Sequence, residues 1–106
     1  MPYPAGLKAD DASTRIRAIK MAGDRRDSSA MPLLIDRLDD EDSAVRLFAI
    51  VALEKITGTR LGYDYAKPAA ERSRAVMRWR NYARSFGGAT TQPAASSESA
   101  GKASSG

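Results

Sequence analysis

Apolar residues recur every three or four positions in several stretches of the chain, and charged or glycine-containing turns separate these stretches. The spacing predicts helices over residues 12–22, 28–38, 43–57 and 69–86. No apolar run alternates with polar residues between turn residues, so no strand is expected. Residues 1–9 contain two prolines and a glycine, which predicts an extended lead-in. The fold class that follows is all-α.

The predicted helices differ in how many of their sides are apolar. The helix over 43–57 carries few charges and is expected to be covered on several sides. In the helix over 69–86, Trp79 lies in the middle of an apolar arc, while the arginines point elsewhere. We therefore expect Trp79 to seal the end of the packed helices. Residues 87–106 are almost all small or polar and predict a disordered tail.

An internal repeat links two of the helices. A shift of 31 positions places residues 11–19 on residues 42–50, with identical Asp, Arg, Ala and Ile at equivalent places. The repeated aspartates, Asp11 and Asp42, are expected to cap the helices that follow them. Arg15 and Arg46 lie one turn further on, within reach of a carboxylate in the same repeat or in a neighbouring one. Such a repeat predicts antiparallel helix pairs stacked in a short solenoid.

Residues 30–53 resemble a complete HEAT repeat of the short bacterial type, which also occurs in phycobilisome-lyase-like proteins. The resemblance rests on Pro32 in the first helix, on the acidic turn over 39–42, and on Val45-Arg46 three residues after Asp42. The segment over 57–82 is similar to the one that closes many bacterial HEAT proteins. Together the resemblance covers residues 10–86. It implies an α-α superhelix whose structural residues include Asp11, Arg15, Pro32, Asp42, Arg46 and Trp79.

The HEAT resemblance implies a non-enzymatic scaffold that binds a protein partner, and the composition agrees. The chain has no Cys and no His, which excludes thiol nucleophiles, Cys/His zinc sites and histidine-based catalysis. The acidic residues over 36–42 lack the spacing and the central glycine of an EF-hand, and they are interpreted as a solvated, helix-capping turn. No catalytic residue, cofactor or metal is expected.

The basic balance of the chain leaves a second function open. The formal net charge is +4, from 17 Lys and Arg against 13 Asp and Glu. The basic candidates for contact with a partner all lie in the last predicted helix: Arg74, Arg78, Arg80 and Arg84. They fan around the helix with no aromatic residue between them on one face, which favours a solvated surface over a dedicated nucleic-acid site. Nucleic-acid binding remains the alternative.

A third hypothesis comes from the family resemblance: the chain is an accessory subunit of a larger, lyase-like HEAT assembly. The first residues contain no apolar signal region, and no run approaches the length of a membrane span. The sequence as written therefore predicts a cytoplasmic protein. A start upstream of Met1 would leave the cell envelope open.

Overall fold

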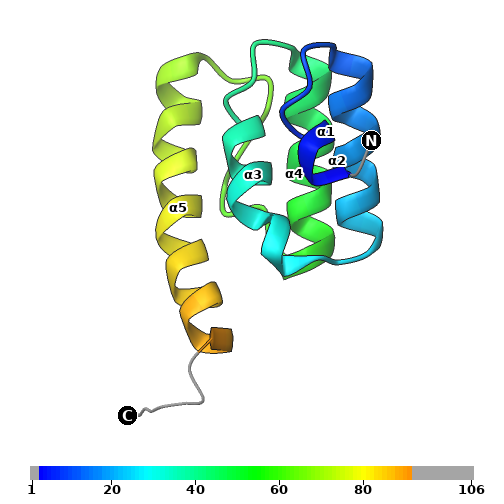
Figure 1. The fold of residues 1–106 in the computed structure, drawn as a ribbon. Helices are drawn as coiled ribbons and strands as arrows, with labels where there is room; N and C mark the ends of the chain where they lie inside the picture. Colours follow the sequence, from blue (N-terminus) through cyan, green and yellow to red (C-terminus); the bar gives the residue numbers. More distant parts are fainter. Residues whose placement is uncertain (1–2, 92–106) are drawn as a thin grey trace.

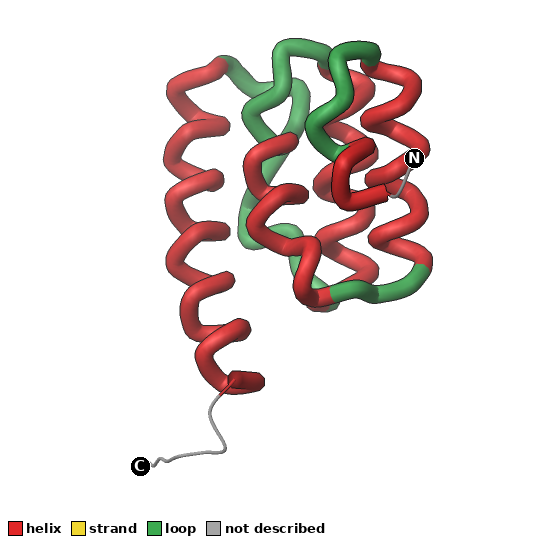
Figure 2. Tube along the Cα trace, viewed as in Figure 1, coloured by secondary structure: helices red, strands yellow, loops and turns green. Residues whose placement is uncertain are grey.

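The structure is a computed structural model that describes residues 3–91, in which every regular element is a helix (Figures 1 and 2). The elements are α1 (Tyr3–Gly6), α2 (Ala12–Asp24), the 3-10 helix η1 (Ser28–Ala30), α3 (Met31–Arg37), α4 (Ser43–Thr57) and α5 (Ala69–Thr91). The all-α prediction is confirmed. The helix expected over 28–38 is divided into η1 and α3, because Pro32 begins the α-helical part at its first turn.

Local hydrogen bonds explain where the two repeated helices begin. Asp11 precedes α2, and its carboxylate accepts the backbone N–H of Thr14 at 2.9 Å. Asp42 precedes α4 and accepts the N–H of Ala44 at 2.8 Å. Each carboxylate satisfies a donor that has no partner within its helix. At the other end of α4, Gly58 has a φ of 85°, a left-handed conformation that glycine adopts without strain.

The two repeated helices, α2 and α4, run parallel and lie side by side (Figure 1). They approach closely at Gly23, where an added Cβ would lie 2.8 Å from Cβ of Ala52. The core between the helices is formed by fully buried aliphatic side chains. Among them, Ile19 and Ile50 occupy equivalent positions in the repeat. Burial of these side chains is the main favourable contribution to the stability of the pair.

The lead-in differs from the extended conformation expected over 1–9. It contains the one-turn helix α1, which packs on α2, and Leu7 directly after it is fully buried. The repeat shift places Leu7 on Leu38, which is also fully buried, and places α1 on the last turn of α3. The helical turn forms because it buries Leu7, a tertiary gain that the local preference of proline and glycine does not include.

The closing segment departs from the regular stack. Residues 58–68 run back along the molecule without a helix, and α5 then runs antiparallel to α3 (Figure 1). In a regular stack, the helix after α4 would be the first helix of the next repeat and would run parallel to α3. The side chain of Tyr63 in this segment donates to the backbone oxygen of Leu38 at 2.5 Å. The segment therefore takes the place where another first helix would pack.

The last helix is longer than expected. The predicted span ended at residue 86, whereas α5 continues to Thr91. Extending a formed helix fixes one residue for each new hydrogen bond, so residues of modest helix propensity can follow a stable core. Residues 92–106, the rest of the expected tail, lie outside the described residues.

Candidate interaction surfaces

The repeated arginines hold the turns that precede the repeated helices. Nη1 of Arg15 donates to the carbonyl oxygens of Ala9 and Asp10 at 2.7 and 2.8 Å. Nη1 of Arg46 donates in the same way to the carbonyl oxygens of residues 40–41, at 2.7 and 3.2 Å. The same bonds in the same register indicate a structural task. A guanidinium supplies several donors in a fixed geometry, which suits clustered carbonyl groups.

Arg15 also bridges to the next repeat, through a carboxylate that the sequence did not single out. Its Nε lies 3.0 Å from Oδ2 of Asp40, and both side chains are almost completely buried. Asp40 also accepts from Arg37 at 3.1 Å and from the N–H of Asp42 at 2.9 Å. The carboxylate of the capping residue Asp11, by contrast, accepts hydrogen bonds from backbone and hydroxyl donors in the first turn of its own helix. The acidic turn of the next repeat was the sequence feature that could have predicted a carboxylate partner for Arg15.

Arg46 reaches forward in a comparable way, but to a carbonyl group. Its Nε donates to the backbone oxygen of Tyr65 at 3.2 Å, in the segment after α4. Beside it, Tyr63 is buried, and burial raises the pKa of its phenol to about 12. These contacts fasten the 58–68 segment to the repeat.

The predicted sealing residue, Trp79, lies fully buried where α5 meets the segment before it. Its indole Nε1 donates to the carbonyl oxygen of Arg60 at 3.0 Å. Its ring meets that of Tyr82 edge to face, with centroids 5.7 Å apart. Trp79 thus combines apolar burial with a satisfied polar atom, as buried indoles require.

The arginines of α5 do not act as one group. Nε of Arg78 donates to the carbonyl oxygen of Leu61 at 2.9 Å, which ties α5 to the preceding segment. Arg74 is exposed, and within the described part of the chain it has no hydrogen-bond or ion-pair partner. Both line a hollow of 170 Å³ together with a lysine and two acidic residues, Asp64 and Glu71. Three basic and two acidic side chains line this hollow, so its charge is mixed and only weakly positive.

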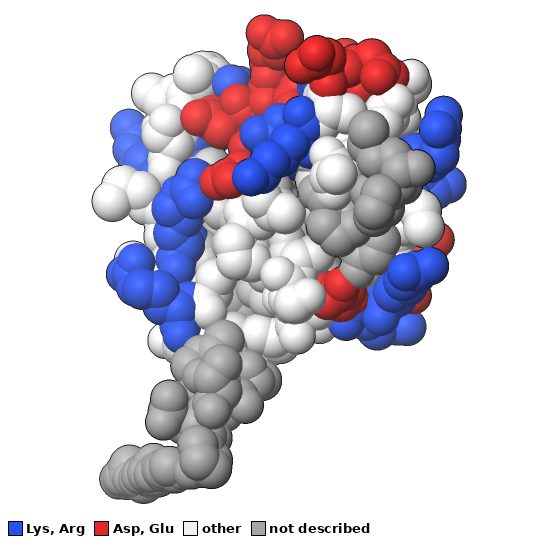
Figure 3. Space-filling model, in the orientation of Figure 1, with Lys and Arg blue, Asp and Glu red and all other residues white. Residues whose placement is uncertain are grey.

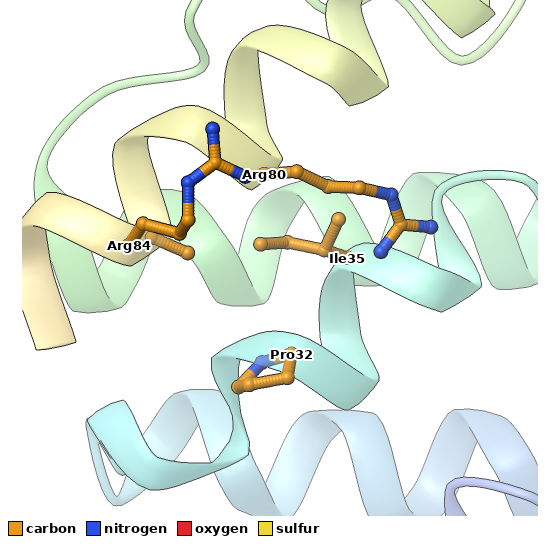
Figure 4. Close-up of a pocket in the computed structure, with 5 residues that line it drawn as sticks. Pro32, Ile35, Arg80 and Arg84 are labelled. Carbon is orange, nitrogen blue, oxygen red and sulfur yellow. The ribbon is translucent and has the colours of Figure 1, made fainter.

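The other two arginines, Arg80 and Arg84, border a groove of 320 Å³ between α3 and α5 (Figure 4). Nη1 of Arg80 lies 3.1 Å from Oδ1 of Asp36 on α3, and Arg84 donates to the side-chain amide of Asn81. The groove is lined by Pro32, Ile35, Arg80, Ala83 and Arg84. Sequence reasoning assigned Pro32 a structural position and did not place it near the arginines, because the antiparallel course of α5 was not predicted.

A second hollow, of 180 Å³, lies on the outward face of α2 and α4. It forms beside the close approach of Gly23 and Ala52, and the partly exposed side chains of Phe48 and Val51 line it. Two lysines lie at its rim, and one of them, Lys55, pairs with an exposed aspartate across the two helices. Apolar surface with a charged rim is typical of the centre of a protein interface.

Charge is distributed unevenly over the molecule. Acidic side chains gather at the end where α2 and α4 begin, and basic side chains follow α5 (Figure 3). Within the described residues, no three acidic side chains are grouped in a way that would hold a metal ion. None of the described helices combines the length and the apolar character that crossing a membrane requires.

Comparison with known proteins identifies the repeat. The family model for HEAT repeats matches residues 5–80, a range that begins at α1 and ends within α5. Searches of curated proteins and of solved structures found no match. The matched range includes both repeated arginines, both capping aspartates and Trp79. The chain therefore belongs to the HEAT-repeat family.

Proposed function

We propose that this protein is a non-enzymatic scaffold that binds a protein partner on the outward face of α2 and α4. HEAT repeats are commonly protein-interaction scaffolds and typically non-catalytic. The observation that carries the proposal is the apolar surface that α4 leaves partly exposed, formed by Leu47, Phe48 and Val51.

Leu47 and Val51 lie outside the hydrophobic core, and Phe48 is only partly buried against it. The inward side of α4 is already filled by fully buried residues, among them Val45, Ile50 and Leu53. Apolar surface left beyond a filled core gains free energy when a partner covers it. The hollow at Gly23 and Ala52 gives this surface a concave centre, which a protruding side chain of a partner fits.

Affinity purification with variants tests this proposal. Val51→Glu places a charge in the hollow, and Ser73→Glu places the same charge on an exposed position of α5, away from this face. We expect partners identified with the wild-type protein to be retained by Ser73→Glu. With a purified partner, Val51→Glu should weaken binding by about tenfold or more, since an interface centre tolerates an unpaired charge poorly.

Circular dichroism of both variants provides the folding control. Equal binding by both variants would place the interface elsewhere, and failure to retain any partner from the organism's own proteins would contradict the scaffold function.

Nucleic-acid binding is the second candidate, and the basic side chains along α5 favour it (Figure 3). That function predicts affinity that falls steeply with salt, because phosphate contacts release counterions. It also predicts loss of binding in Arg78→Glu and Arg80→Glu variants. Titration of a labelled oligonucleotide at two salt concentrations separates it from the scaffold function.

A further inference from the structure

We propose that the groove between α3 and α5 is a docking site for an acidic helical peptide that carries apolar side chains. This site goes beyond the scaffold function proposed for the outward face of α2 and α4, because it lies on different helices and uses different residues. Three features of the groove carry the proposal: its apolar floor, its weakly engaged arginines and the spacing between them.

The floor of the groove is apolar. Pro32 and Ile35 come from α3 and Ala83 comes from α5, and none of these side chains carries a polar atom. The volume of 320 Å³ lies at the small end of the range of about 300–1,000 Å³ that is typical of ligand sites. An apolar side chain that enters the groove leaves water and contacts a rigid surface, since Ile35 is itself part of the packed core.

The rim of the groove carries two positive charges that an incoming carboxylate can reach. Arg80 pairs with Asp36, but the two side chains are 50% and 43% exposed, and such an exposed pair is worth at most about 1 kcal/mol. Within the described residues, the polar partner of Arg84 is the neutral amide of Asn81. The charge of Arg84 is therefore not neutralised by a carboxylate. Arg80 can readily exchange its partner Asp36 for another carboxylate.

The two arginines have the spacing of a helical ligand. Arg80 and Arg84 are four residues apart on α5, so they occupy one face and successive turns. Figure 4 shows the Arg80 side chain extending away from Arg84, with Ile35 and Pro32 of α3 on the facing side of the groove. A peptide helix with carboxylates on successive turns would present matching acceptors while its apolar side chains enter the groove. Arginine–carboxylate pairs are among the stronger charge-assisted hydrogen bonds.

The same groove suits a nucleic acid poorly. None of its five lining residues is aromatic, so it offers no platform on which a base would stack. A phosphate backbone would gain the two positive charges but would leave the apolar floor exposed to water. The apolar floor therefore favours a peptide with apolar side chains over a nucleic-acid backbone.

Fluorescence anisotropy with defined probes tests the proposal on the full chain. The probe is a fluorescein-labelled peptide of repeated Glu-Glu-Leu-Leu units. Three comparison ligands accompany it: the same peptide with every Leu replaced by Ser, the same peptide with every Glu replaced by Lys, and a labelled oligothymidylate. Two protein variants reverse one charge each. Arg84→Glu acts at the groove, and Arg17→Glu acts at an exposed arginine on α2.

We expect the Glu-Leu peptide to bind and the Lys peptide not to bind. The Ser peptide should bind about tenfold more weakly, the effect of losing one well-buried leucine. Arg84→Glu should weaken binding of the Glu-Leu peptide about fivefold or more, whereas Arg17→Glu should change it less than about twofold. In NMR spectra, the amide signals that shift on titration should be those around Ile35 and Ala83.

Three results would overturn the proposal. Absence of binding by the Glu-Leu peptide would show that the groove does not accept this chemistry. Equal affinity for the Ser peptide would show that binding depends on charge alone and that the apolar floor contributes nothing. Tighter binding of oligothymidylate with the same dependence on Arg84 would assign the surface to nucleic acid. Val51→Glu should leave peptide binding unchanged, so failure here is distinguishable from failure of the scaffold function.

Discussion

Arg15 and Asp40 form a buried ion pair that joins two successive repeats. Nε of Arg15 on α2 lies 3.0 Å from Oδ2 of Asp40, in the turn between α3 and α4. The turn also receives a hydrogen bond from Arg37, so one carboxylate holds two guanidinium groups. Because Asp40 is desolvated, its replacement would leave the positive charge of Arg15 buried without its counter-charge.

Asp40→Ala should therefore lower the free energy of unfolding by about 3 kcal/mol or more, because breaking a buried pair leaves an uncompensated charge. The matched control is Asp36→Ala, which removes the partner of Arg80 from an exposed pair and should lower it by less than about 1 kcal/mol. Urea unfolding, followed by the fluorescence of the single tryptophan, measures both. Equal losses in the two variants would contradict a structural role for the buried pair.

Gly23→Ala should destabilise the protein although alanine favours helices more than glycine does. The new Cβ would lie 2.8 Å from Cβ and 2.9 Å from Cα of Ala52, so α2 and α4 would have to separate. Overpacking of this kind costs about 1–3 kcal/mol, against a gain of about 1 kcal/mol in helix propensity.

A double-mutant cycle with Ala52→Gly measures this coupling. Removal of the opposing methyl should restore part of the stability that Gly23→Ala loses. If Gly23→Ala alone raised the midpoint of urea unfolding, that result would contradict a tight contact between α2 and α4 at Gly23.

The buried phenol of Tyr63 should make the protein sensitive to alkali. Its pKa is raised to about 12, above that of an exposed tyrosine, so the folded state holds the phenolic proton more tightly than the unfolded state. The resulting stability is fully present below about pH 10 and is lost as pH rises through about 12.

Tyr63→Phe provides the comparison for this pH dependence. At neutral pH the variant should be less stable by about 1 kcal/mol, since it lacks the hydrogen bond to the carbonyl oxygen of Leu38. Between about pH 10 and 12, however, its stability should fall less than that of the wild type. Parallel curves for the two proteins in urea unfolding would show that the phenol does not ionise differently in the folded state.

The cap of α2 should respond to acid in the opposite direction. Hydrogen bonds from Ser13 and Thr14 lower the pKa of Asp11 to about 2. The stability that this provides is present above the unfolded value near pH 4 and is lost as pH falls through about 2. Asp11→Asn keeps a capping oxygen but cannot ionise, so its stability should fall less over this range. Denaturant unfolding of both proteins between about pH 5 and 2 checks this, and identical pH profiles would contradict it.

The sequence was a good guide wherever the relevant interactions are short-range. The boundaries of α4 are as predicted, because Asp42 and Gly58 act on the first and last turns of that helix alone. The shift of 31 residues relates Arg15 to Arg46, and both arginines donate to carbonyl groups of the turn before their own helix. Helix capping and repeat register depend on residues a few positions apart, and the sequence displays them directly.

Predictions were weakest where contacts join distant segments. The lead-in was expected to be extended, but burial of Leu7 outweighs the local preference of its prolines and glycine. The candidate arginines of α5 were treated as one set, although Arg78 ties α5 to the chain before it and Arg84 borders the groove. Which arginine is available for a partner depends on the neighbours that packing supplies.

By itself, the sequence determined the all-helical class, the repeat and the positions of the caps, because these follow from periodicity and local hydrogen bonding. Only the tertiary structure decided that Arg15 pairs with Asp40, that α5 runs antiparallel to α3, and that Pro32 and Arg84 share one groove. The physical reason is that desolvation and close packing depend on which surfaces meet in space. The spacing of residues along the chain does not show which distant residues come into contact.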